Sequence, residues 1–120
     1  MKTIKTAPFY SIATIQSSGG SQFVSFAKSR KFQKELYEDL AAPYFDSGDF
    51  YVETWRHGPG NLDSDCTKPS KVYNIEQIEF RTANITFKTL KDHSKWMVEK
   101  EKKIICVGDI NRQVKISKLN

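Results

Sequence analysis

The sequence predicts a mixed α/β or α+β fold in a single domain. Its 120 residues are enough to build one hydrophobic core. One early segment has apolar residues at three- and four-residue steps, which is the spacing of a helix. The other segments are short and rich in β-branched and aromatic residues, which is typical of strands. The predicted order is a strand, a helix and then a run of strands, which indicates the α/β or α+β class.

The first predicted strand is Phe9–Gln16, and the turn-forming sequence SSGG ends it. A helix is predicted over about residues 21–40, with Ser21 as its cap and Pro43 beyond its end. The apolar residues that carry this helical spacing are Phe23, Phe26, Ala27, Leu36 and Leu40.

The later elements are predicted to be strands. DFYVETWR (49–56) alternates with the period of a strand, and the sequence HGPGNLDSDCTKPSK after it is a loop. VYNIEQIEF (72–80) and NITFKTL (84–90) are two further strands. SKWMVE and KIICVGDI flank the charged link EKEKK and predict a β-hairpin, in which the strand Ile104–Val107 is fully buried.

The composition limits the class of partner. A net charge of +5 and a pI near 9.2 favour a polyanion, such as nucleic acid, acidic lipid or acidic polysaccharide. No apolar run is long enough to cross a membrane, and the N-terminus does not resemble a signal peptide. The two cysteines, Cys66 and Cys106, form no zinc-binding pattern.

The sequence DHSKW (92–96) holds a candidate catalytic pair. In extended backbone, His93 and Lys95 project from the same face, with Ser94 turned the other way. A lysine offers a fixed cation to phosphate oxygens, and a histidine can attack phosphorus or protonate a leaving oxygen. The alternative is a solvated turn, because one H-x-K sequence in a lysine-rich chain also arises by chance.

The sequence CVGDINR (106–112) gives a second candidate segment. Gly108 would let the backbone approach a ligand closely. Asp109, Asn111 and Arg112 follow the end of a predicted strand, where sites are often built. The alternative is an ordinary strand exit with turn residues.

Taken together, DHSKW and CVGDINR resemble the C-terminal part of the deoxyribonuclease II family, which has a phospholipase D-like fold. GGSQFVSFAKSRKFQKELYEDLAAPYF, ETWRHGPGNLDSDC and VYNIEQIEF resemble the family segments upstream. The resemblance is strongest over residues 17–113. It predicts that residues 1–120 form one partial domain, equivalent to the C-terminal half of the family fold, with a mixed sheet flanked by helices.

The resemblance implies a metal-independent acid endodeoxyribonuclease that leaves 3′-phosphates and needs no cofactor. His93 matches a catalytic histidine and Lys95 a phosphate-binding lysine. Asn111 and Gly108 match supporting positions, and Asp92 has either a supporting or a structural role. His57 matches no motif and is interpreted as a surface histidine. DNA is the implied partner, and a lysosome or a secretion is the implied location.

The chain also departs from the family pattern. The family site uses two H-x-K motifs, and this sequence contains one, so a homodimer would be needed to complete a two-histidine site. Cys66 and Cys106 match family cysteines, each of which is expected to pair with a cysteine of a further family segment. Asn84 begins an N-I-T glycosylation sequon. Two alternative hypotheses remain. The chain is either an inactive family member that binds DNA through its basic surface, or a fragment that does not fold stably alone.

Overall fold

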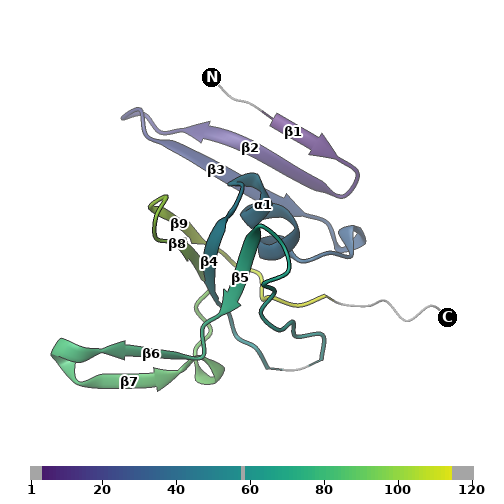
Figure 1. Cartoon of the computed structure of the whole chain (residues 1–120). Helices are drawn as coiled ribbons and strands as arrows, with labels where there is room; N and C mark the ends of the chain where they lie inside the picture. Colours follow the sequence, from purple (N-terminus) through teal and green to yellow (C-terminus); the bar gives the residue numbers. More distant parts are fainter. Residues whose placement is uncertain (1–3, 58, 115–120) are drawn as a thin grey trace.

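The computed structural model describes residues 4–57 and 59–114. Three sheets and a few short helical segments make up the fold, which confirms the α+β class (Figure 1). A three-stranded sheet lies on one side of a helical turn, and a four-stranded sheet lies on the other (Figure 1). Among the described residues, no helix is both long enough and apolar enough to cross a membrane.

The first sheet has the order β1-β2-β3 and is antiparallel, with strands Ile4–Ala7, Tyr10–Gln16 and Gln22–Lys28. The strand predicted at Phe9–Gln16 is confirmed. The helix predicted over 21–40 is wrong, because its first third is β3. In β3, Val24 and Phe26 are partly buried while Phe23 is 59% exposed, so the burial alternates with a period of two. Gly20, at a φ of 90°, turns the chain back into this strand.

The second sheet has the order β5-β4-β8-β9. Its strands are Gly48–Glu53 (β4), Ser70–Asn74 (β5), Trp96–Glu99 (β8) and Ile104–Val107 (β9). Strand β5 runs parallel to β4, whereas the β4–β8 and β8–β9 pairs are antiparallel. The predicted strand at 49–56 is confirmed as β4 up to Glu53, and the predicted final hairpin is confirmed.

The prediction that Ile104–Val107 is fully buried is wrong. Strand β9 lies at the edge of the sheet, and its side chains alternate between partly buried and exposed. Ile105 is 77% exposed and Val107 is 87% exposed. The continuous apolar sequence therefore reflects an edge strand with one unpacked apolar face, not a strand covered on both faces.

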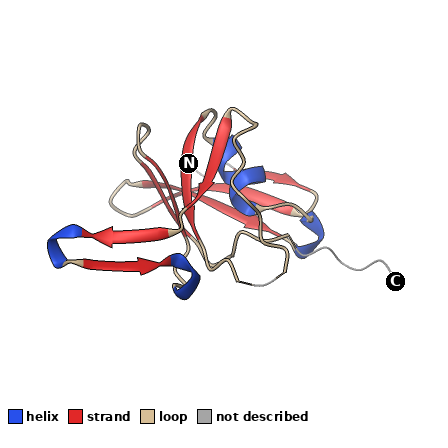
Figure 2. Cartoon of the chain, turned by 60° about the horizontal axis from the view of Figure 1, so that its bottom comes forward, coloured by secondary structure: helices blue, strands red, loops and turns tan. Residues whose placement is uncertain are grey.

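A separate two-stranded hairpin projects from the second sheet (Figure 2). It consists of Gln77–Phe80 (β6) and Ile85–Lys88 (β7), joined by the 3-10 turn η3 (Arg81–Ala83). The single strand predicted at 72–80 is therefore two strands, β5 and β6, which belong to different sheets. The strand predicted at 84–90 is confirmed at its centre as β7, and it ends in the 3-10 turn η4 (Thr89–Lys91).

The central helical segment is short. A π-helical turn, η2 (Tyr37–Ala41), continues into α1 (Ala42–Tyr44), and a 3-10 turn, η1 (Arg30–Phe32), precedes it. The buried apolar side chains come from β2, this segment, β4, β5 and β8. They are Ile12, Leu36, Tyr37, Leu40, Ala41, Ala42, Phe50, Val52, Val72 and Met97. The helical turn thus supplies half of a core that the flanking sheets complete.

Glu35 caps the start of this helical turn. Its carboxylate accepts hydrogen bonds from the backbone N–H groups of Tyr37 (3.1 Å) and Glu38 (2.6 Å). In return, the Asp39 carboxylate accepts from the Glu35 N–H at 2.7 Å. The first N–H groups of a helix have no partner within it, so these bonds satisfy donors that would otherwise be buried and unpaired.

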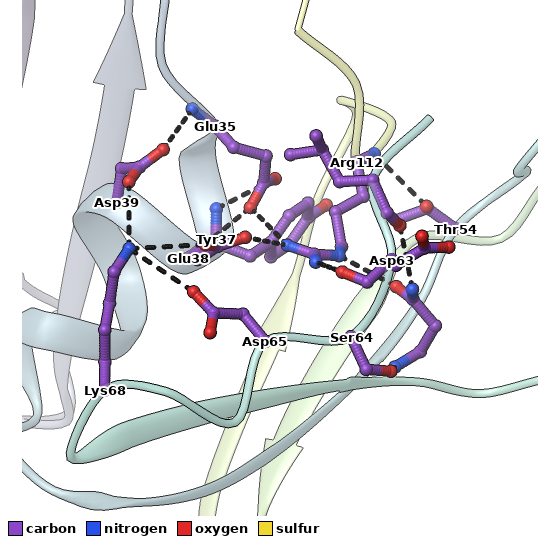
Figure 3. A network of polar contacts seen from close by, with 12 residues as sticks. Glu35, Tyr37, Glu38, Asp39, Thr54, Asp63, Ser64, Asp65, Lys68 and Arg112 are labelled. Carbon is purple, nitrogen blue, oxygen red and sulfur yellow. Dashed lines mark hydrogen bonds and ion pairs between the residues drawn. The ribbon is translucent and has the colours of Figure 1, made fainter. Parts of the chain in front are cut away.

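Arg112 binds the capped end of the turn (Figure 3). Its side chain is fully buried, and Nη1 lies 3.0 Å from Glu35 Oε2 and 2.9 Å from Glu38 Oε2. The guanidinium also donates to Asn74 Oδ1 (2.8 Å) and to the Asp63 carbonyl. Four parts of the chain therefore meet at one cation: the helical turn, the loop after β4, strand β5 and the C-terminal segment.

Removing this cation should destabilise the fold. Arg112→Ala is expected to lower the free energy of unfolding by about 3 to 5 kcal/mol, because it leaves the fully buried Glu35 carboxylate without its counter-charge. The measurement is urea denaturation. Lys68→Ala is the control, since Lys68 contacts Glu38, Asp39 and Asp65 from a half-exposed position. It should cost less than about 1 kcal/mol. Equal losses in the two variants would contradict the central role of Arg112.

Candidate active site

Residues 92–95 form a link without regular structure between η4 and β8. Asp92 shapes this link, because its Oδ1 accepts from the Ser94 N–H at 3.0 Å. His93 is exposed, and Lys95 is partly buried. Lys95 Nζ donates to the His93 carbonyl at 2.6 Å, so the lysine side chain folds back along the link. The two residues of the H-x-K motif are thereby held in contact with each other.

Three aromatic rings stack beside this link. The His93 imidazole lies over Trp55 with ring centroids 4.5 Å apart and an interplanar angle of 19°. His57 also stacks on Trp55, at 5.3 Å and 21°. Trp55 is fixed in turn, because its indole N–H donates to the Leu90 carbonyl at 3.0 Å. The structure thus gathers both histidines of the chain on one indole, which orients the His93 ring.

The prediction for His57 is confirmed in part. It is exposed, as expected for a surface histidine, but its ring also belongs to the stack. The local signal for this was the W-x-H spacing just after β4, which puts Trp55 and His57 on the same side of an extended chain. The proximity of His93 depends on the pairing of β4 with β8, which the local sequence does not reveal.

Gly108 lies next to the H-x-K motif. Its N–H donates to the Lys95 carbonyl at 2.9 Å, directly after the Trp96–Val107 pair of β8 and β9. A Cβ atom at this position would lie 2.8 Å from the Tyr37 hydroxyl. That hydroxyl donates to the Ile110 carbonyl at 2.7 Å, and burial raises the pKa of Tyr37 far above its ordinary value. The glycine therefore allows a close approach of Tyr37, and the approach of a ligand to its backbone stays a prediction.

Asn111 occupies a different position from the H-x-K residues. It lines a cavity of about 510 Å³ together with Lys28 and Arg30. Its Oδ1 atom is buried and accepts no hydrogen bond from any described residue. Among the described residues, no hydrogen bond joins Asn111 to His93 or Lys95, so the supporting role expected for Asn111 remains a prediction.

A carboxylate that the sequence did not single out lies under the motif. Glu53, at the end of β4, is fully buried, and its Oε2 lies 2.5 Å from Ser94 Oγ. The same hydroxyl lies 2.6 Å from Asp92 Oδ2. Burial raises the pKa of Glu53, and the Asp92 charge raises it further, whereas Ser94 and Lys95 lower it. The Ser94 hydrogen bonds hold the pKa of Asp92 below its ordinary value.

The alternation in DFYVETWR explains why Glu53 was missed. Phe50, Val52 and Thr54 form the apolar face, and all three are buried as expected. Glu53 shares the other face with Tyr51, which is 40% exposed. On this face of β4 the side chain of Tyr51 is exposed, whereas that of Glu53 is covered by residues 92–95. The covering segment is distant in the sequence, so the local pattern of β4 could not predict the burial of Glu53.

Comparison with known proteins places these residues in a family. The family model described as Deoxyribonuclease II matches residues 1–118. The chain belongs to the deoxyribonuclease II family. Plancitoxin-1 of Acanthaster planci is 39% identical over 112 residues, which cover 92% of this chain and 31% of that protein. Deoxyribonuclease-2-alpha of Sus scrofa is 38% identical over 106 residues, or 88% of this chain and 29% of that protein.

A bacterial relative shows the same pattern. The putative deoxyribonuclease-2 of Burkholderia thailandensis is 40% identical over 103 residues, which cover 82% of this chain and 29% of that protein. The chain therefore spans roughly a third of the length of the relatives it matches. No solved structure was found to match it.

Two further family predictions concern residues outside the stack. Cys66 is exposed and Cys106 is partly buried, and both are free thiols. Their pairing with cysteines of another family segment stays a prediction. Asn84 is exposed in the turn between β6 and β7, where its sequon is accessible, and its glycosylation stays a prediction. Among the described residues, no group of three histidine, cysteine or acidic side chains could hold a metal ion.

Proposed function

We propose that this chain contributes to a metal-independent acid endodeoxyribonuclease that leaves 3′-phosphates. The observation that carries the proposal is the H-x-K motif of a deoxyribonuclease II family chain, with an exposed His93 held by Trp55 and Lys95 folded beside it. His93 and Lys95 are the proposed catalytic residues. Gly108, Asn111 and Asp92 are proposed to support them. The proposed setting is an acidic compartment, lysosomal or secretory.

The proposed chemistry requires two histidines. The neutral imidazole of one attacks phosphorus, while the other, as imidazolium, protonates the 5′ oxygen as the P–O bond breaks. Water then attacks the phosphohistidine, gives up a proton to the second histidine and releases the 3′-phosphate. A lysine ammonium holds the non-bridging oxygens. The two histidines must titrate separately, because one acts neutral and the other charged. His93 takes one of these roles.

The second histidine is proposed to come from a second copy of this chain. The sequence contains one H-x-K motif. Strand β9 offers a surface for the contact, because it is an edge strand with Ile105 and Val107 exposed. These two residues also line an open, largely apolar groove of about 760 Å³ that reaches across to β3. Such a dimer would consist of two halves of a phospholipase D-like fold.

A second candidate function is DNA binding without cleavage. It is favoured by the net charge of +5 and by the cavity that Lys28 and Arg30 line with Asn111. A cation at such a surface neutralises a backbone phosphate and releases a counterion, which needs no complete catalytic site.

The nuclease proposal predicts plasmid nicking at about pH 5 with EDTA present, where a typical histidine is mostly protonated. His93→Ala and Lys95→Ala should each lower the rate at least about 100-fold, because each removes a group that acts on the phosphate. His57→Ala is the matched control, since it removes the other histidine of the stack and should retain most of the rate. Equal activity of His93→Ala and the wild type would contradict the proposal.

The binding proposal predicts an affinity for duplex DNA that falls linearly with the logarithm of the salt concentration. The double variant Lys28→Ala, Arg30→Ala should reduce the magnitude of that slope by about 2. Arg81→Ala, on the far turn of the β6–β7 hairpin, should leave it unchanged. Filter binding measures these slopes. A flat salt dependence would exclude phosphate binding.

A further inference from the structure

We propose that Glu53 is a positioning residue, held as a neutral carboxylic acid that fixes the H-x-K link through Ser94 only while it keeps its proton. The positioning itself rests on the geometry of Glu53, Ser94 and Asp92. Its effect on catalysis rests in addition on the nuclease function proposed above.

The number of available protons leads to this assignment. Ser94 Oγ lies 2.5 Å from a Glu53 oxygen and 2.6 Å from an Asp92 oxygen. A hydroxyl carries one hydrogen and can donate to only one of two carboxylates. Both contacts are hydrogen bonds only if one carboxyl group carries a proton of its own. That carboxyl donates to Ser94 Oγ, and Ser94 donates to the other.

Glu53 is the carboxyl that keeps the proton. It is fully buried, and its second oxygen, Oε1, accepts no hydrogen bond from any described residue. An ionised carboxylate with an unpaired buried oxygen is costly, whereas a neutral acid tolerates it better. Asp92 is less buried, and its Oδ1 accepts from the Ser94 N–H. The chain of donors therefore runs from Glu53 to Ser94 to Asp92.

The charged groups around Glu53 do not reverse this assignment. The described titratable groups that interact electrostatically with Glu53 are Asp92, Lys95 and Tyr37. Lys95 is the only cation among them, and its Nζ donates to the His93 carbonyl instead. Asp92 disfavours a charge on Glu53, and Tyr37 of the helical turn carries no charge at acid pH, since its pKa is raised still further above its ordinary value. Burial is the main reason that the pKa of Glu53 is raised.

The consequence is a pH-dependent position for the catalytic pair. When Glu53 loses its proton, two carboxylates face one hydroxyl, and Ser94 can hold only one of them. Ser94 stands between His93 and Lys95, so displacing it moves both. Acid pH is then needed to hold the H-x-K link in place, in addition to protonating a histidine.

The direction of the effect on stability follows from linkage. Glu53 keeps its proton to a higher pH in the folded chain than in the unfolded chain. Its contribution to the free energy of unfolding is therefore complete at low pH and falls as the pH rises above the ordinary glutamate value of 4.5. It is lost once the pH passes the folded-state pKa. Burial also raises the pKa of Glu35, so only the difference between the wild type and Glu53→Gln reports on Glu53.

Carboxyl-carbon NMR of the full chain tests the proton directly. The expected result is a Glu53 titration clearly above 4.5, accompanied by a shift of the Trp55 indole N–H signal, because His93 stacks on that ring. Titration of Glu53 at or below 4.5 would overturn the proposal, as would a Trp55 signal that does not follow it. This readout does not require the chain to cleave DNA.

Variants test the effect on activity. Glu53→Gln keeps a donor toward Ser94 but cannot ionise, so its nuclease pH profile should extend to higher pH than that of the wild type. Ser94→Ala removes the bridge and should lower activity across the profile. Glu79→Gln, an exposed position on β6, is the control and should match the wild type. An unshifted Glu53→Gln profile would overturn the proposal. A raised Glu53 titration in a chain that does not cleave DNA would support the positioning and contradict the nuclease function.

Discussion

One buried guanidinium holds the parts of this fold in register. Arg112 neutralises Glu35 and Glu38 at the start of the helical turn, and its side chain also bonds to strand β5 and to the loop after β4. Its backbone N–H donates to the Thr54 hydroxyl at 3.2 Å. Thr54 lies in the sequence between Glu53 and Trp55, which contact Ser94 and His93 of the H-x-K link. The ion-pair network around Arg112, on the opposite face of the β4 chain, therefore helps to fix the position of the H-x-K link.

The Glu35–Glu38 pair and Glu53 are held in two different ways in this structure. Glu35 and Glu38 are paired with Arg112, and backbone N–H groups satisfy more of the lone pairs of Glu35. Among residues 4–57 and 59–114, no cation forms an ion pair with Glu53, and the Ser94 hydroxyl lies within hydrogen-bonding distance of both Glu53 and Asp92. The first arrangement makes Arg112 necessary to the fold, because its loss would leave a buried carboxylate uncompensated. The second depends on the proton of Glu53, so the position of the H-x-K link responds to pH.

Local patterns predicted the strands and the motif but not the contacts between them. The strand at β2, the strand β4 and the β8–β9 hairpin were predicted because alternation and apolar runs are local signals. The helix over 21–40 was wrong because Phe23 and Phe26 also fit helical spacing, and their separation onto opposite faces of β3 depends on pairing with β2. The burial of Glu53 and the stacking of His93 on Trp55 arise between residues about 40 positions apart, as the pairing of β4 with β8 requires. The motif itself could be found because H-x-K and G-D-I-N-R are each an uninterrupted stretch of sequence.

The central claim is that this chain supplies one half of a two-histidine site. The most direct test is the specific nuclease activity as a function of chain concentration, measured alongside the fraction of dimer by sedimentation. If two copies build one site, specific activity should rise with concentration in parallel with the dimer fraction, and Ile105→Lys on the open edge of β9 should lower both together. Specific activity that is constant while the chain passes from monomer to dimer would contradict the claim.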